Sequence, residues 1–415
     1  MNLHSKEENN WSLVSRIILK FAFTYFTLFI LLLFFAFFLE IPLRWFADNI
    51  LNWGADFKME STGSGDRSFD FVRLALNVFL SLIVGGFWSF LFKNKITDTK
   101  LLYWFQVLLR VFLFAVMTLY GLAKVFKGQF ADPSLELLLQ PVGEMSPMGL
   151  AWTFMGHSMS YNIFLGVLEI IGGFLLLSRK TTTFGAFVVF GVMLNVVFMN
   201  FTYDIPVKLF STNLVLMSLV LLIIDRERIF NFFIRNKEVK EKQYATYIKN
   251  KSLLKVISFL KKAIQIIVII LVFVQCFIQF KATAQLKSKS KLYGIWEADL
   301  FIKENDTLLP LITDNYRWRY LIIDYKGKAA VKKMNESIDR YLITENVELK
   351  EIVFSKTLDS LPNKFSYSLI DKNKIRFIGT LNGEQLNIEF NKIPEKSFRL
   401  KNRGFHWVNE ATYNY

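Results

Sequence analysis

Long apolar runs divide this chain and restrict what it can fold into. About seven runs of about 18 to 25 mostly apolar residues stand between short polar stretches, and a helix of that length crosses the roughly 30 Å of a bilayer's hydrocarbon. The whole chain is 53% hydrophobic and 16% aromatic, above the usual values for a soluble domain. We therefore predict a mainly α-helical integral membrane protein with transmembrane helices at residues 17–39, 71–92, 101–126, 160–177, 184–201, 208–224 and 256–280.

The C-terminal part has a different pattern. From about Lys291 onward, β-branched and aromatic residues alternate with polar ones over short runs, as in residues 317–324, 340–344, 374–380 and 385–390. Asn382-Gly383 between two such runs supplies the positive φ angles of a tight hairpin. We predict an all-β domain over residues 287–415, with about eight antiparallel strands in a barrel or a sandwich.

Basic residues mark the side of the membrane on which each loop lies. Lys and Arg accumulate in cytoplasmic loops near the ends of the spans, and here they fall in alternate loops, most densely between Arg226 and Lys255. The intervening loops carry acids such as Asp48, Asp132 and Glu144. We predict a bacterial cytoplasmic (inner) membrane protein with its N-terminus inside and a periplasmic β domain.

These patterns divide the chain into five regions. They are two N-terminal transmembrane helices (residues 1–100), a four-helix core (101–225), a basic cytoplasmic loop (226–255), a seventh helix (256–280) and the β domain (287–415). The formal net charge of +15 is explained by the cytoplasmic loops, so we expect the lipid bilayer and not a nucleic acid to be the partner of the basic residues.

Several kinds of chemistry are not expected. Cys276 is the single cysteine, which excludes an intramolecular disulfide and a CxxC pair, and the three histidines are scattered. Neither a Walker loop nor a dinucleotide-binding glycine motif is present in the sequence. We predict no metal site, and any redox role would depend on a diffusible cofactor such as a quinone.

Two charged residues stand inside the predicted spans, where an ionisable side chain usually marks function or a required pairing. Arg110 lies nine residues from the cytoplasmic end of the third span and Glu169 lies eight from that of the fourth, so both are roughly 12 to 14 Å deep. We predict that they form an ion pair, with either a structural role or a catalytic role in proton or substrate chemistry.

Polar residues also gather toward the predicted outer face. The set could bind an anion, or hydrogen-bond a quinone headgroup, with His157 or Asp204 exchanging protons; the alternative is ordinary anchoring at the interface. The long loop at residues 127–159, which leads into His157, could be a lid over this site or a connector. The predicted binding residues are Lys124, Asn162, Asn195, Asn200, Tyr203 and Lys208.

The four-helix core carries a family resemblance. Arg110, then Tyr120-Gly121-Leu122-Ala123-Lys124, then Glu169-Ile170-Ile171-Gly172-Gly173 resemble the DoxX family over residues 101–225. That family is named for a subunit of a thiosulfate:quinone oxidoreductase, so the resemblance implies a link to quinone or sulfur redox chemistry and to a redox partner subunit. In addition, Gly294-Ile295-Trp296 resembles the opening of lipocalin-like barrels, although a Trp that fills a small β core explains these residues equally well.

Three hypotheses for function follow. The first is a redox-associated membrane protein with an outward-facing pocket for a quinone or small molecule. The second is a transporter or channel for a small anion, in which Arg110 and Glu169 line the path. The third is a non-catalytic envelope protein whose β domain binds a lipid or a partner protein.

Overall fold

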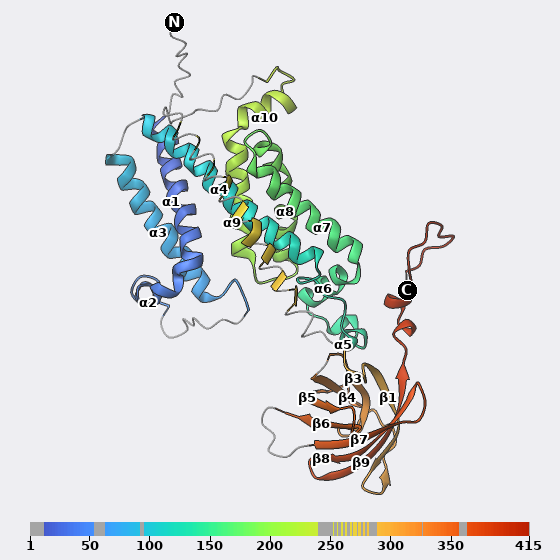
Figure 1. The fold of residues 1–415 in the computed structure, drawn as a ribbon. Coiled ribbons are helices and arrows are strands. Elements are labelled where there is room, and N and C mark those ends of the chain that lie inside the picture. Colours follow the sequence, from blue (N-terminus) through green and yellow to red (C-terminus); the bar gives the residue numbers. More distant parts are fainter. Residues whose placement is uncertain are drawn as a thin grey trace. The chain divides into compact units, whose positions relative to one another are not determined.

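The computed structural model describes residues 12–53, 63–91, 95–239, 289–325, 327–356 and 363–414, with some positions of 252–281. The chain forms two compact units (Figure 1). The helix unit comprises Met1–Gln129 and Ser160–Cys276, and the barrel unit comprises Phe130–Met159 and Phe277–Tyr415. The predicted helix at residues 256–280 is described at only some of its positions, and Cys276 lies outside the described residues.

Six of the predicted spans are helices, with ends within a few residues of those predicted. Five of these helices are long and apolar enough to cross a membrane, and a sixth qualifies if α9 and the short helix α10 (Arg226–Phe233), which meet at 73°, count as one span. The six helices are α1 (Leu13–Phe35), α3 (Ser68–Leu91), α4 (Lys95–Val125), α7 (Met159–Leu177), α8 (Thr182–Thr202) and α9 (Lys208–Ile224).

Shorter helices occupy segments that were predicted to be loops, except η1 (Ala36–Leu39), which forms the end of the first predicted span. The predicted connector at 127–159 contains most of them, and its Ser146 caps one of these helices by accepting a hydrogen bond from the Gly149 N–H at 3.0 Å. Pro147 at the first helical position suits that start. The short elements are η1 (Ala36–Leu39), α2 (Glu40–Asn49), α5 (Leu135–Leu138), η3 (Val142–Glu144) and α6 (Pro147–His157).

The helix unit exposes many apolar side chains, and its buried residues include polar and small ones as well as apolar ones. In α3, Phe87 and Phe90 are 68% and 77% exposed, whereas Asn77, Ser81 and Gly85 are buried. This distribution is the reverse of a water-soluble helix and is typical of helices that face lipid and contact one another through small residues.

The barrel unit contains a closed antiparallel sheet. Eight strands close when β1 pairs with β9, and the two-residue β2 adds to the edge of β1. The prediction of about eight antiparallel strands is therefore confirmed, and of the two predicted arrangements the sheet forms the barrel. Asn382 and Gly383 have the expected positive φ angles of 53° and 88°. The strands are β1 (Gly294–Lys303), β2 (Asp306–Thr307), β3 (Trp318–Ile323), β4 (Lys328–Lys333), β5 (Ile338–Asn346), β6 (Glu351–Ser355), β7 (Asn363–Leu369), β8 (Lys374–Leu381) and β9 (Glu384–Ile393).

Aromatic side chains fill the interior of this barrel. Trp318 is 1% exposed, and its ring lies 5.9, 6.1 and 6.3 Å from those of Phe354, Phe365 and Phe390. Trp296 is also buried, and its indole N–H donates to the Leu292 carbonyl at 2.9 Å. This packing supports the interpretation of Trp296 as a core residue, while the lipocalin resemblance stays a prediction.

Helix α5 packs on the outside of the barrel. Leu135 is 2% exposed and lies in one apolar cluster with Ile295, Ile322 and Ala330. Its backbone N–H donates to the Asp324 carboxylate at 3.1 Å, and an ion pair joins Arg340 to Glu136 of α5. Burial raises the pKa of Asp324, and the bond from Leu135 partly offsets that shift. The loop predicted to be a lid or a connector therefore carries a helix that is part of the barrel unit.

Candidate functional site

Helices α4 and α7 approach each other at glycines. A side chain on Gly121 would lie 2.6 Å from the Gly166 carbonyl oxygen, and one on Gly166 would lie 2.4 Å from the Gly121 oxygen. Because these distances are too short for a Cβ atom, only glycine fits at either position. The two backbones are thus close enough for charged side chains of α4 and α7 to meet between the helices.

Lys124 and Glu169 meet in this way. The Lys124 Nζ donates to both carboxylate oxygens of Glu169, at 2.8 and 2.9 Å, and the two side chains are 6% and 2% exposed. The Lys124 ammonium also lies 5.7 Å from the centre of the Tyr120 ring. A buried cation that contacts both oxygens of one carboxylate offsets part of the cost of removing both charges from solvent.

The predicted ion pair between Arg110 and Glu169 is wrong. The Arg110 Nε and Nη2 donate to the carbonyl oxygens of Leu176 and Leu177, at 2.6 and 2.7 Å. These carbonyls end α7, where backbone oxygens lack helical partners and the helix dipole favours a cation. Arg110 therefore caps α7, and Lys124 is the cation that pairs with Glu169.

The error came from the assumption that α4 and α7 end at the same level. Helix α4 begins at Lys95, and the guanidinium of Arg110 already lies at the last turn of α7, so α4 continues beyond it. The glycines would have given the correct register, because Gly121 and Gly166 must face each other for close approach. Lys124 follows Gly121 by three residues and Glu169 follows Gly166 by three, which places both side chains near that contact.

The residues predicted to form an outer site are brought together only in part, with Asn200, Asp204 and Lys208 near the start of α9. Asn162 is fully buried on α7, whereas Asn195 is exposed on α8, and Asn200 donates to the Ser211 hydroxyl at 2.9 Å. Tyr203 is 38% exposed. His157 is exposed at the end of α6 in the barrel unit, so the predicted cluster is not a single site of the helix unit.

Asp204 and Lys208 belong to a salt bridge near the start of α9. The Lys208 Nζ lies 2.7 Å from an Asp204 oxygen, and the Asp204 side chain is 85% exposed. Asp66 accepts hydrogen bonds from the backbone N–H groups of Lys208 and Leu209, at 2.8 and 3.0 Å. Asp66 thus caps α9 from the segment that precedes α3, which the sequence did not predict.

A second buried charge cluster lies at the first turn of α4. Asp98 is fully buried; its carboxylate lies 2.6 Å from the Arg16 Nε and 3.3 Å from the Lys20 Nζ, both on α1. Lys20 itself is 1% exposed. The sequence analysis expected basic residues on the cytoplasmic side, and the acid Asp98, three residues before Leu101, was the signal that could have located the contact with α1.

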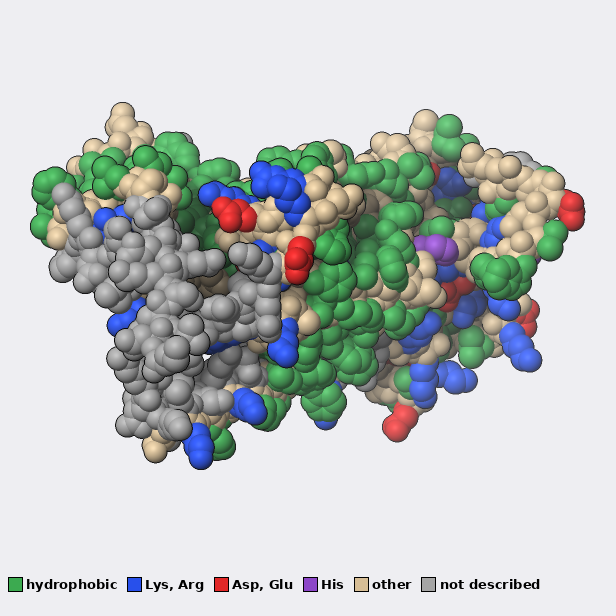
Figure 2. Space-filling model, turned by 90° about the horizontal axis from the view of Figure 1, so that it is seen from above, with side chains coloured by type: hydrophobic (Ala, Val, Ile, Leu, Met, Phe, Trp, Pro, Cys, Tyr) green, Lys and Arg blue, Asp and Glu red, His purple; other side chains and the backbone are tan. Residues whose placement is uncertain are grey.

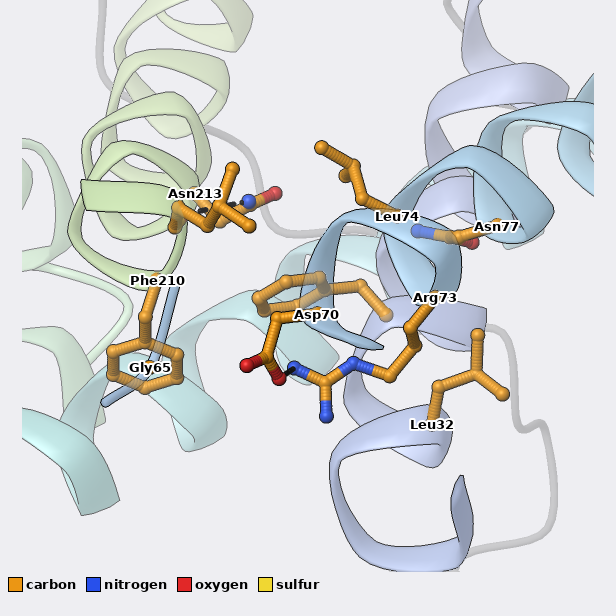
Figure 3. Close-up of a pocket in the computed structure, with 10 residues that line it drawn as sticks. Leu32, Gly65, Asp70, Arg73, Leu74, Asn77, Phe210 and Asn213 are labelled. Atoms are coloured by element: carbon orange, nitrogen blue, oxygen red, sulfur yellow. Dashed lines mark hydrogen bonds and ion pairs between the residues drawn. The ribbon is translucent and has the colours of Figure 1, made fainter. Parts of the chain in front are cut away.

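A third cluster lines a small pocket between α1, α3 and α9, shown in Figure 3. The Asp70 carboxylate pairs with Arg67 at 3.0 Å and with Arg73 at 3.1 Å. Asn77 and Asn213 line the same pocket, whose volume of about 20 Å³ suits a water molecule or a small ion. Among the residues that the structure describes, no group of three or more His, Cys, Asp and Glu could hold a metal ion.

Comparison with known proteins identifies one family. No family model matches the chain, and no solved structure matches it. A segment of 134 residues, 32% of the chain, is 36% identical to the protein of Bacillus subtilis (strain 168) named "Uncharacterized protein YwoB" and covers 84% of it. The DoxX resemblance stays a prediction. Over this segment, the chain belongs to the same family as YwoB.

Proposed function

We propose that the protein spans the bacterial cytoplasmic membrane about seven times, with its N-terminus inside and its barrel in the periplasm. Support comes from the apolar helices with exposed phenylalanines and from the basic residues in alternate loops. A periplasm-dependent reporter fused after Tyr415 should be active, and one inserted near Lys240 should be inactive. Activity at Lys240, or none at Tyr415, would contradict this topology.

Within this membrane protein, we propose that Lys124 and Glu169 form a proton-exchanging site. The observation that carries the proposal is their direct contact between two apolar helices, where each side chain is almost fully buried. Transfer of the proton from the ammonium to the carboxylate converts two buried charges into two neutral groups, which lowers the desolvation cost. A small change in local field or hydrogen bonding can therefore move this proton.

Such a site suits redox-associated chemistry of the kind that the DoxX resemblance implies. Reduction of a quinone consumes protons, and a buried carboxyl group can store or deliver one at membrane depth. In this proposal Glu169 holds the proton and Lys124 holds the carboxylate in place when the proton leaves. A quinone or another lipid-soluble acceptor would bind within reach of the pair and supply the redox chemistry.

Infrared difference spectroscopy of the full chain in nanodiscs tests this proposal. Addition of a short-chain quinone and its reduced form should change the carboxyl C=O absorption, and Glu169→Gln should abolish that change. Asp204→Asn, which alters an exposed acid, is the control and should leave the change intact. If Glu169→Gln showed the same quinone-dependent change in C=O absorption as the wild type, the signal would belong to another carboxyl group and the proposal would be refuted.

The pocket beside Arg73 favours a second candidate, passage of a small anion. Arg73 is a cation beside a volume that suits a small ion, and it pairs there with Asp70. The amides of Asn77 and Asn213 in the same lining donate to the carbonyls of Tyr25 and Leu209. Uptake of a halide into proteoliposomes should then depend on Arg73, while Arg44→Gln, at an exposed arginine of α2, serves as the control. Equal uptake by Arg73→Gln and by the control would exclude this path.

A further inference from the structure

A second pocket lies where the α7–α8 turn meets α10. Its volume is about 620 Å³, which is in the range of sites that hold small organic ligands. We call it the α10 pocket. Its lining residues are Arg179, Lys180, Thr183, Phe184, Phe187, Arg228, Ile229, Phe232, Phe233 and Val239.

Basic residues dominate the polar lining of the α10 pocket. Arg179, Lys180 and Arg228 line it, and none of its lining residues in the described part of the chain is acidic. Arg228 is half-buried, yet among the described residues it forms neither an ion pair nor a hydrogen bond. Asp225, the acid just before α10, accepts a hydrogen bond from the Thr183 hydroxyl. The described part of the pocket thus combines a net positive charge with the Arg228 guanidinium, which none of the described groups binds.

Aromatic side chains form the other part of the lining. Phe184, Phe232 and Phe233 are 64%, 63% and 63% exposed. Helix α10 bends 73° away from α9, so its phenylalanines cannot continue the apolar surface of a straight span. Figure 2, which views the molecule from above, shows Lys and Arg side chains beside broad hydrophobic areas. Cations beside exposed phenylalanines at the end of a span are the chemistry of a membrane interface.

We propose that the α10 pocket binds an anionic glycerophospholipid. The phosphate contacts Arg228 and Lys180, and the acyl chains lie on the phenylalanines. This inference rests on the membrane location in the proposed function and is independent of the Lys124–Glu169 site. A free phosphate could satisfy the same cations, but it would leave the phenylalanines uncovered, so the aromatic lining favours the lipid.

Native mass spectrometry of the full-length protein tests the inference. Protein from nanodiscs that contain phosphatidylglycerol and phosphatidylcholine should retain phosphatidylglycerol preferentially. Removal of two cations near the headgroup in Arg228→Gln/Lys180→Gln should reduce that preference by roughly 10- to 30-fold. The matched control is Arg235→Gln/Lys237→Gln, which removes the same charge at exposed positions just beyond α10 and should retain the preference.

Three outcomes would overturn the inference. Equal loss in the test and control variants would show diffuse attraction to the surface and no pocket. Competition by soluble glycerol phosphate as strong as that by the lipid would identify a free anion as the ligand. Absence of any retained lipid, phosphatidylcholine included, would refute the membrane location, whereas a negative infrared result at Glu169 would leave the lipid site unaffected.

Discussion

The two units of this protein place the same kinds of residue in opposite positions. In the barrel, Trp318 and its phenylalanine neighbours fill the interior, while ion pairs such as Arg376 with Glu389 lie toward the outside. In the helix unit, phenylalanines such as Phe87 and Phe90 face outward and the pair Lys124–Glu169 lies inside. The difference indicates that the two units fold against different surroundings, because apolar side chains gain by burial only where the alternative is water.

The largest expected effect tests the buried charges of the helix unit. Lys124→Met or Glu169→Leu alone should cost about 3 to 5 kcal/mol, because each leaves a buried charge without its partner, whereas the double variant should recover most of that loss. Thermal unfolding of the detergent-solubilised wild type, the two single variants and the double variant measures these losses of stability. Single variants as stable as the wild type would mean that water reaches the pair.

One matched pair of substitutions compares the surroundings of the two units directly. Leu321 is fully buried in the barrel and Leu82 is 59% exposed on α3. Leu321→Ala should destabilise the barrel by about 2 to 5 kcal/mol through the cavity that it leaves, while Leu82→Ala should have little effect in a bilayer. Hydrogen exchange of the β3 and α3 amides in the full chain reports each unit separately. Similar losses of stability in Leu321→Ala and Leu82→Ala would contradict the view that the two units fold in different surroundings.

A smaller effect distinguishes the cap of α7 from an ion pair. Arg110→Gln should cost about 1 to 3 kcal/mol, since it removes donors from the carbonyls of Leu176 and Leu177. Its effect should add to that of Glu169→Leu, because Arg110 does not contact Glu169. Double-mutant unfolding measures the coupling. If the double variant Arg110→Leu/Glu169→Leu recovered stability, the result would support the ion pair between Arg110 and Glu169 that the sequence predicted.

The smallest effect concerns a salt bridge on the barrel surface. Arg376 lowers the pKa of Glu389 by a hydrogen bond and by its charge. Since the folded-state pKa lies below its ordinary value, the pair stabilises the barrel above that ordinary value and loses its effect as pH falls through the lowered one. Arg376→Gln should cost about 0.2 to 1 kcal/mol at neutral pH and nothing in acid, as measured by hydrogen exchange of β8. A cost that persists in acid would indicate lost packing.

The sequence by itself determined the segments of this protein. The mostly apolar run at residues 208–224 predicted α9 to the residue, and the alternating pattern with Asn382-Gly383 predicted the strands β8 and β9. These features were accessible because helix and strand periodicity and hairpin turns depend on residues close in sequence. The bend into α10 and the caps at Ser146 and Asp66 were missed, since their apolar runs are short or their partners are distant.

Only the tertiary structure decided which charges meet. Arg110 and Glu169 lie at nearly equal distances from the ends of their apolar runs. Nevertheless, Lys124 is the residue that pairs with the Glu169 carboxylate, and Arg110 donates to the carbonyls at the end of α7. The register of two packed helices is set by how closely their backbones approach, here at Gly121 and Gly166, and the lengths of the apolar runs do not encode it. The attachment of α5 to the barrel was inaccessible for the same reason, because Leu135 and Asp324 are far apart in the sequence and only the closed sheet brings Asp324 to the helix.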